Sequence, residues 1–156
     1  MPHEGVLPAS ALAEFHGVSS SYLLKHLQAL AAVGILSSAP GPTGGYRLAR
    51  ETRDISLLDI VLALEGAEPA FRCENIRLRG PSPVSSKPKG LCGINAAMLR
   101  AEQAYRRELE QVSIADLLAQ VSAKDPDGRI AARACGFVQL HFRRPSESSA
   151  RTRSKQ

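Results

Sequence analysis

The fold of this chain is decided by residues 12–48, which have the sequence LAEFHGVSSSYLLKHLQALAAVGILSSAPGPTGGYRL. Gly17 follows a short apolar segment, at a point where two crossing helices leave room for only a small side chain. Ser19 is of the type that caps helix N-termini, and helical spacing begins directly after it. Three leucines then share one helix face: Leu23, Leu27 and Leu30. The stretch therefore predicts two short helices joined by a tight turn.

A β-hairpin is predicted directly after the second helix. Gly34 ends that helix, and the apolar residues Ile35 and Leu36 begin a strand. Residues 40–45, Pro-Gly-Pro-Thr-Gly-Gly, are typical of a turn, and the chain returns through residues 46–48. Two helices followed by such a hairpin form a winged helix-turn-helix, which places one helix in the DNA major groove. The alternative is a small α+β segment with no role in DNA binding, and the glycine-rich hairpin argues against it.

The length and composition restrict the class of protein. A chain of 156 residues can form one substantial core, or a small domain with a dimerising arm. No run of apolar residues is long enough to span a membrane, and residues 1–10 lack the features of a secretory signal. The three cysteines are irregularly spaced, unlike those of a secreted disulfide scaffold. We therefore expect a cytoplasmic protein with no membrane partner.

The net charge of +5 does not by itself indicate nucleic-acid binding. Residues 1–80 contain seven Lys/Arg and eight Asp/Glu, whereas residues 121–156 contain eight and three. The positive excess belongs to the C-terminal residues, so the hypothesis of DNA binding rests on the helix-turn-helix pattern. Because the DNA-binding domain is nearly neutral, we expect few phosphate contacts per subunit and a modest dependence of the DNA affinity on salt concentration.

Helical patterns continue beyond the hairpin. One capping box, Ser56 with Asp59, opens a helix that Gly66 closes, and a second box opens a short helix at Ser113. The longest helical pattern runs over residues 92–112. Its apolar stripe consists of Ile94, Ala97, Met98, Ala101, Ala104, Tyr105, Leu109 and Val112. Such a stripe suits a seam between two subunits, and an intramolecular core stripe has the same periodicity.

The expected fold is mostly α with a small β-wing: a winged helix-turn-helix with a long dimerisation helix. We expect four regions. These are a winged helix-turn-helix DNA-binding domain (1–66), a cysteine-bearing linker or sensor loop (67–91), a dimerisation helix with a short packing helix (92–121) and a flexible basic tail (122–156).

Three segments in order carry a resemblance to a known family. They are LAEFHGVSSSYLLKHLQALAAVGIL, GPTGGYRLAR and ISLLDIVLALEG, and over roughly residues 5–121 the chain resembles the Rrf-type winged-helix regulators, the family of IscR, NsrR and CymR. The resemblance implies a homodimeric, DNA-binding transcriptional regulator. Many members sense iron–sulfur status, nitric oxide or redox state through cysteines that follow the winged domain.

The expected partner is double-stranded DNA. Polar residues at the start of the second helix point away from its leucines, where they would meet base edges and phosphates. The residues we expect to contact DNA are Ser19, Ser20, Ser21, Tyr22, Lys25 and Gln28 in this helix, and Thr43, Gly44, Tyr46 and Arg47 in the wing. The twofold symmetry of a dimer implies a palindromic operator. Family members often carry arginine where this chain has Pro40, which argues against minor-groove recognition by the wing.

The metal-binding candidates are Cys73 and Cys92, which could hold a [2Fe–2S] cluster. Such a cluster needs four ligands, and this chain lacks the tight three-cysteine cluster of the better-known family members. Three interpretations stay open: an iron–sulfur sensor with further ligands from Glu, His or a partner subunit, a cluster-free thiol switch, and inert cysteines. Arg72 would favour the thiolate of Cys73. Cys135 lies outside the resemblance and is expected to be a plain small residue.

A second departure concerns the N-terminus. Family members normally begin with a further helix before the segment that matches Leu7, whereas here Met1 falls almost at the helix-turn-helix. The alternative function is therefore a truncated or non-sensing family member that acts through dimerisation as an interaction protein. An enzyme is not expected, since the sequence shows no Ser/His/Asp or Cys/His constellation, no phosphate-binding loop and no paired carboxylates in an evident pocket. We accordingly expect no small-molecule substrate among its partners.

Overall fold

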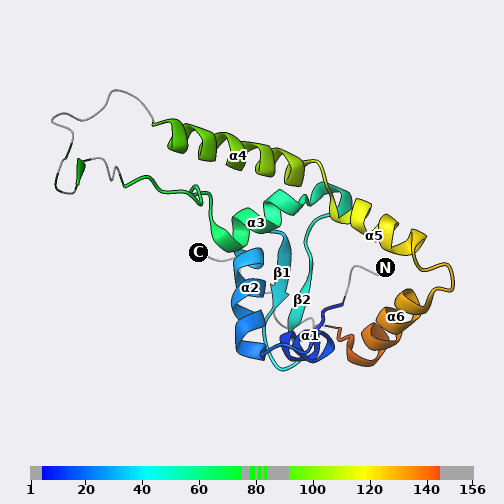
Figure 1. Cartoon of the computed structure of the whole chain (residues 1–156). Helices are drawn as coiled ribbons and strands as arrows, with labels where there is room; N and C mark the ends of the chain where they lie inside the picture. The colour runs from blue at the N-terminus through cyan, green and yellow to red at the C-terminus, as the bar shows by residue number, and fades with distance from the viewer. Residues whose placement is uncertain (1–4, 75–77, 80, 82, 84–91, 145–156) are drawn as a thin grey trace.

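The computed structural model describes residues 5–74, 78–79, 81, 83 and 92–144, and its first elements are the predicted helix-turn-helix (Figure 1). Helix α1 spans Ala9–His16 and α2 spans Ser20–Ala32. Gly17 adopts a left-handed conformation with φ of 65°, which a residue with a Cβ atom rarely adopts. Ser19 caps α2, because its hydroxyl oxygen accepts a hydrogen bond from the backbone N–H of Tyr22 at 3.2 Å.

The wing is a two-stranded antiparallel sheet. Strand β1 spans Leu36–Ala39 and β2 spans Gly45–Leu48, with Leu36 opposite Leu48. The segment before α1 extends this sheet, since Leu7 pairs with Tyr46 through two backbone hydrogen bonds of 3.0 and 2.9 Å. The buried core lies between these elements and consists of Val6, Ala11, Ala13, Leu27, Ile35 and Ile55.

Both capping boxes form as predicted. Ser56 caps α3 (Leu57–Glu65) and Ser113 caps α5 (Ile114–Ala123). The two caps lie side by side, because Ser56 and Ser113 form an isolated antiparallel bridge just after η1 (Thr52–Asp54) and the fully buried Ile55. Hydrogen bonds from the side chain and backbone of Ser113 hold the pKa of Asp116 below its ordinary value.

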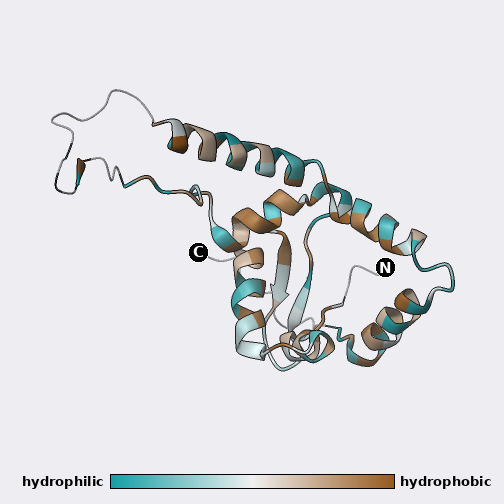
Figure 2. Cartoon of the chain, viewed as in Figure 1, coloured by the Kyte–Doolittle hydropathy of each residue, from teal (hydrophilic) through white to brown (hydrophobic). Residues whose placement is uncertain are grey.

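Helix α4 spans Gly93–Glu110 and lies over α3 (Figure 1). Figure 2 shows that α3 is mainly apolar, whereas polar and apolar residues alternate along α4. The predicted stripe divides into two parts. Ile94, Met98 and Tyr105 are exposed, whereas Leu109 and Val112 are half-buried against the rest of the chain. Much of the apolar surface of Ile94, Met98 and Tyr105 is therefore exposed to solvent.

The prediction of a flexible segment after Val121 is wrong for residues 129–141, which form helix α6 (Arg129–His141). Asp125 precedes this helix and stabilises its N-terminus: its carboxylate accepts hydrogen bonds of 2.8–3.2 Å from the backbone N–H groups of Arg129, Ile130 and Ala131. The rings of Phe137 and Phe15 pack at 4.5 Å, so α6 is held against α1. The remaining residues of the predicted tail, 145–156, lie outside the described residues.

The observed architecture is the one predicted, mostly helical with one two-stranded sheet among the described residues. Within that part of the chain, no helix combines the length and the apolar character needed to cross a membrane.

Candidate nucleic-acid interface and cysteine segment

The predicted DNA-contacting residues of α2 lie on its exposed face. Leu27 is buried, so helix geometry turns Ser20, Ser21, Lys25 and Gln28 outward, and all four are exposed. Ser19 is exposed as well, but its hydroxyl already caps the helix and lies 2.9 Å from that of Ser21. This face offers one cation and several neutral hydrogen-bonding groups to a ligand.

Two aromatic side chains define one edge of this face. Tyr22 is 61% exposed, and its ring meets that of His26 edge-on at 4.5 Å. The Nε2 atom of His26 is buried and has no hydrogen-bond partner among the described residues. The packing on His26 orients Tyr22, whose hydroxyl extends the polar surface of α2.

The wing residues are partly used within the wing itself. The guanidinium Nε of Arg47 donates a hydrogen bond to the Ser37 hydroxyl at 3.0 Å, and the backbone of Tyr46 pairs with Leu7. The N–H of Gly44 donates to the carbonyl of Gly41 at 2.9 Å, and a Cβ atom on Gly44 would lie 2.1 Å from the carbonyl oxygen of Ala39. The glycine is thus required by the turn, whereas Thr43 and the side chain of Arg47 are exposed.

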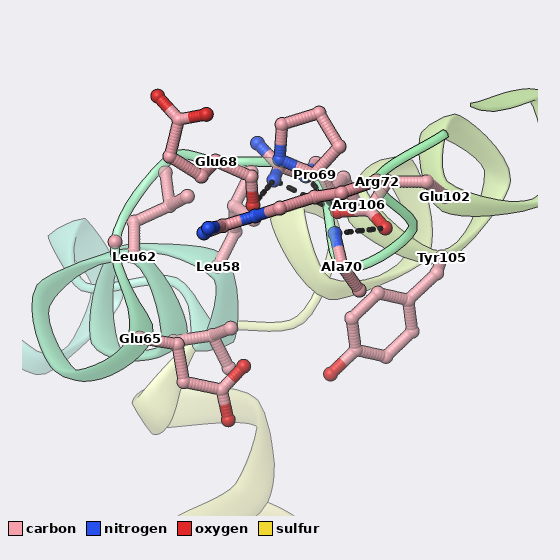
Figure 3. Close-up of a pocket in the computed structure, with 12 residues that line it drawn as sticks. Leu58, Leu62, Glu65, Glu68, Pro69, Ala70, Arg72, Glu102, Tyr105 and Arg106 are labelled. Carbon is pink, nitrogen blue, oxygen red and sulfur yellow. Dashed lines mark hydrogen bonds and ion pairs between the residues drawn. The ribbon is translucent and has the colours of Figure 1, made fainter. Parts of the chain in front are cut away.

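A clamp on α4 holds the segment that leads to Cys73. We call the pair Glu102 and Arg106 the α4 clamp; its two side chains form an ion pair of 2.8 Å. Arg106 also donates hydrogen bonds to the carbonyl oxygens of Ala67 and Glu68, at 2.9 and 3.3 Å (Figure 3). The second carboxylate oxygen of Glu102 accepts a hydrogen bond from the backbone N–H of Ala70 at 3.2 Å. The clamp thus fixes residues 67–70 to α4.

The clamp also stabilises the ionised form of Glu102. The hydrogen bond from Arg106, followed by that from Ala70, holds the pKa of Glu102 below its ordinary value, so this carboxylate is ionised at neutral pH. Figure 3 shows the clamp beside a cavity of about 300 Å³ between α3, α4 and residues 66–72. Leu58 and Leu62 of α3 line this cavity together with Arg72 and Tyr105.

The two predicted metal-binding residues lie at the ends of a long segment. Cys73 is half-buried and follows the clamped Ala70 by three residues. Cys92 is the N-cap of α4, where its Sγ atom accepts a hydrogen bond from the backbone N–H of Asn95 at 3.4 Å.

The described residues do not fit a cluster held within one chain. Within residues 5–74, 78–79, 81, 83 and 92–144, no three His, Cys, Asp or Glu side chains form a group that could hold a metal ion. Glu74, the carboxylate beside Cys73, is paired with Arg79 at 3.1 Å. His3 and Glu4 lie outside the described residues.

Two sets of contacts were missed by the sequence analysis. The clamp was missed because the partners of Arg106 lie 38 and 39 residues away, although Glu102 and Arg106 have the spacing of a helical ion pair. The second missed contact is made by Arg143: its guanidinium donates a hydrogen bond of 2.8 Å to the carbonyl oxygen of Pro42 in the wing. The sequence signal that indicates α6 is the helical spacing of four residues that are all half-buried: Ala134, Phe137, Val138 and His141.

Comparison with known proteins identifies the family. Residues 1–120 match the family model Rrf2, described as an iron-dependent transcriptional regulator. The protein YffB of Lactococcus lactis is 35% identical over 117 residues, which cover 75% of this chain and 74% of that protein. The protein Rrf2 of Nitratidesulfovibrio vulgaris is 31% identical over 111 residues, covering 71% and 70%.

A solved structure agrees with this family in fold. The structure of IscR from T. potens superposes with a TM-score of 0.56 at 28% identity, covering 76% of this chain and 72% of that one. The resemblance and the fold class predicted from the sequence are confirmed. Because the family and these relatives are regulators, the expectation that this chain is not an enzyme is also confirmed. This chain therefore belongs to the Rrf2 family of transcriptional regulators.

Proposed function

We propose that this protein is a homodimeric repressor or activator that binds a palindromic operator and whose affinity for DNA depends on the state of Cys73 and Cys92. The observation that carries the proposal is that the chain has both an exposed polar face on α2 and an exposed apolar stripe on α4. The first face suits the major groove, and the second suits a copy of the same helix. Such a protein works in the cytoplasm, where its DNA is found.

The DNA-binding proposal assigns roles to residues on both elements. Lys25 and Gln28 are placed to read base edges, while the serines and Tyr22 bind phosphates. Thr43, Gly44, Tyr46 and Arg47 form the wing contact, with Thr43 and Arg47 contributing exposed side chains. The test is selection of binding sites from a random duplex library, followed by affinity measurement with K25A and Q28A. A palindromic consensus whose binding is weakened by either substitution supports the proposal, whereas recovery of no consensus contradicts it.

The dimer proposal rests on the exposed side chains of α4. Ile94 is 70% exposed and Met98 is 43% exposed, although both are apolar and lie four residues apart on one face. A second copy of α4 would cover them and would set the distance between two α2 helices. The test is sedimentation velocity on the Ile94→Lys and Met98→Lys variants, with the exposed Gln103→Lys variant of the same helix as a control. We expect the two stripe variants to be monomeric and the control to be dimeric; three equal sedimentation coefficients would contradict the seam.

The sensing proposal rests on the way both cysteines are tied to α4. Cys92 caps this helix, and Cys73 follows the segment that the clamp fixes to it. In the thiol form of the proposal, hydrogen peroxide takes two electrons and two protons from the two thiols, which yields a disulfide and water. In the cluster form, the thiolates supply two of four ligands and the partner subunit supplies the others.

Purification without oxygen separates the two forms of sensing. Visible absorption, with iron and sulfide contents near stoichiometric and lost in the Cys73→Ser and Cys92→Ser variants, supports the cluster. A colourless protein whose DNA affinity changes between peroxide and dithiothreitol supports the thiol switch. The control is Cys135→Ser, since Cys135 is exposed on α6. DNA binding that is the same in all of these states contradicts sensing by these cysteines.

The alternative function, a family member that pairs with another regulator and does not bind DNA, predicts a different result. Such a chain would dimerise through α4 but would bind no duplex from the random library. The selection experiment therefore separates the two functions directly.

A further inference from the structure

The end of α6 is joined to the edge of the wing sheet. This helix follows the part of the chain that matches the family model, residues 1–120. Two residues after it, Arg143 pairs with Val6 through backbone hydrogen bonds of 2.9 and 3.0 Å, and Val6 is 1% exposed. Leu7 pairs in turn with Tyr46 of β2. The segment of Val6 and Leu7 therefore lies between β2 and the backbone of Arg143.

The packing of α6 on the rest of the chain holds Arg143 at this place. The ring of Phe137 lies 4.5 Å from that of Phe15 on α1. A Cβ atom on Gly5 would lie 1.7 Å from the ring of Phe142, so the chain can approach this ring only with a glycine. Contacts on both sides of Arg143, in the helix before it and at the sheet edge, thus fix its backbone beside the wing.

The side chain of Arg143 contacts the turn of the wing. Its guanidinium Nη1 donates a hydrogen bond of 2.8 Å to the carbonyl oxygen of Pro42, in the turn between β1 and β2. The turn is also closed from within, by the hydrogen bond of 2.9 Å from the N–H of Gly44 to the carbonyl of Gly41. The contact from Arg143 connects the tip of the wing to an element outside the winged domain.

This hydrogen bond fixes the direction of a second polar group. The Pro42 carbonyl and the Thr43 N–H belong to one peptide group, which is trans, so the N–H points to the side opposite the carbonyl. A cation bound to the carbonyl also polarises the peptide, which makes its N–H a stronger donor. Thr43 is exposed, and neither its N–H nor its hydroxyl is hydrogen-bonded to another described residue. Both donors are therefore open to a ligand.

The chemistry of these two donors suits a phosphate oxygen. Backbone N–H groups and threonine hydroxyls are common donors to DNA phosphates, and they need no net charge. Residues 1–80 contain seven Lys/Arg and eight Asp/Glu, so neutral donors matter in this winged domain.

We propose that Arg143 is a positioning residue for DNA binding, which orients the peptide between Pro42 and Thr43 so that the N–H and hydroxyl of Thr43 bind one phosphate. This proposal rests on the proposed function, since it requires the wing to lie on DNA beside the α2 face. Arg143 acts through the turn, because its guanidinium is engaged with the Pro42 carbonyl.

The test compares full-length variants of two neighbouring arginines. Arg143→Ala removes the donor to Pro42. The matched control is Arg144→Ala, since Arg144 is exposed and makes no hydrogen bond or ion pair with a described residue. The probe is the consensus duplex from the selection experiment, with each symmetry-related pair of phosphates replaced in turn by neutral methylphosphonates. The measurement is the affinity for each duplex by fluorescence anisotropy, for both variants, for Thr43→Ala and for the wild type.

We expect Arg143→Ala to bind the unmodified duplex about 2- to 10-fold more weakly per subunit, the range that corresponds to one net hydrogen bond. Thr43→Ala identifies the wing phosphate as the position where methylphosphonate costs it less affinity than it costs the wild type. Arg143→Ala should lose sensitivity at this same phosphate and keep it at the phosphates contacted by α2. Arg144→Ala should keep the wild-type pattern. A merely structural role would weaken binding without selecting one phosphate.

The other outcomes overturn the positioning role. Wild-type affinity and pattern in Arg143→Ala would show that the contact with Pro42 does not matter for binding. Equal losses in Arg143→Ala and Arg144→Ala would show an effect of charge alone. Lost sensitivity at a phosphate other than that of Thr43 would make Arg143 a direct contact. Each of these results leaves DNA binding by α2 intact, whereas a wild-type chain that binds no duplex contradicts the proposed function itself.

Discussion

At the scale of single residues, the α4 clamp makes a prediction about pH. The folded chain lowers the pKa of Glu102, chiefly through the hydrogen bond from Arg106, so the clamp contributes stability above the usual pKa of glutamate. That contribution is lost as pH falls through the lowered value in the folded state. Amide hydrogen exchange at Ala70 should therefore become faster on acidification, after correction for intrinsic exchange rates. In Glu102→Ala, which removes the acceptor of the Ala70 N–H, the exchange should be fast already at neutral pH; equal protection in both proteins would contradict the clamp.

Two glycines should respond to alanine in opposite directions. A Cβ atom on Gly45 would lie 2.4 Å from the carbonyl oxygen of Leu7, so Gly45→Ala must push apart β2 and the segment before α1. We expect a loss of about 1 to 3 kcal/mol in the free energy of unfolding, measured with urea. Gly136 is inside α6 and a Cβ atom there meets nothing within 4 Å. Gly136→Ala should therefore stabilise the protein by about 0.5 to 1 kcal/mol.

At the scale of elements, the parts that were predicted correctly are those with local causes. The cap at Ser56 is formed with Asp59, three residues later, so its signal is contained in a few letters of sequence. The docking of α6 depends on pairs such as Val6 with Arg143, which no local pattern reveals. The same holds for the candidate site: exposure on α2 follows from helical spacing, whereas the contacts of Arg106 with Ala67 and Glu68 depend on the tertiary fold.

The docking of α6 is itself testable. Phe137 is half-buried against Phe15, so Phe137→Ala should lower the free energy of unfolding by about 2 kcal/mol, less than for a fully buried phenylalanine. Leu140 on the same helix is 83% exposed, and Leu140→Ala should change the free energy of unfolding by less than about 0.5 kcal/mol. Denaturant unfolding of both variants provides the measurement. Equal effects of the two substitutions would mean that α6 is not packed on α1 in solution.

At the scale of the whole molecule, the proposed function requires a physical connection between the cysteines and the DNA-binding face. Helix α4 is capped by Cys92, carries the clamp and packs on α3, which in turn packs on α2. In the proposed mechanism, a change at either cysteine would act on α4, the helix that carries the proposed dimer seam. The clamp is the connection on the Cys73 side, since it fixes residues 67–70 to α4. A ligand or redox state can shift DNA affinity only by its differential interaction with two arrangements of these helices.

This connection predicts that the clamp can be removed without removing DNA binding. Coupling between two sites typically changes affinity by a factor of about 5 to 150. If the clamp carries this coupling, Arg106→Ala should bring the DNA affinities of the two cysteine states close to each other. The control is Arg107→Ala, which removes an exposed guanidinium from the neighbouring position of α4 and should leave the ratio unchanged. Titration of the selected operator with each variant, in peroxide and in dithiothreitol, provides both affinities. The α2 face is intact in Arg106→Ala, so this variant should still bind DNA. If its two DNA affinities are then nearly equal, the clamp couples the cysteines to DNA binding. If their ratio is that of the wild type, the coupling runs through Cys92 and the N-terminus of α4 alone.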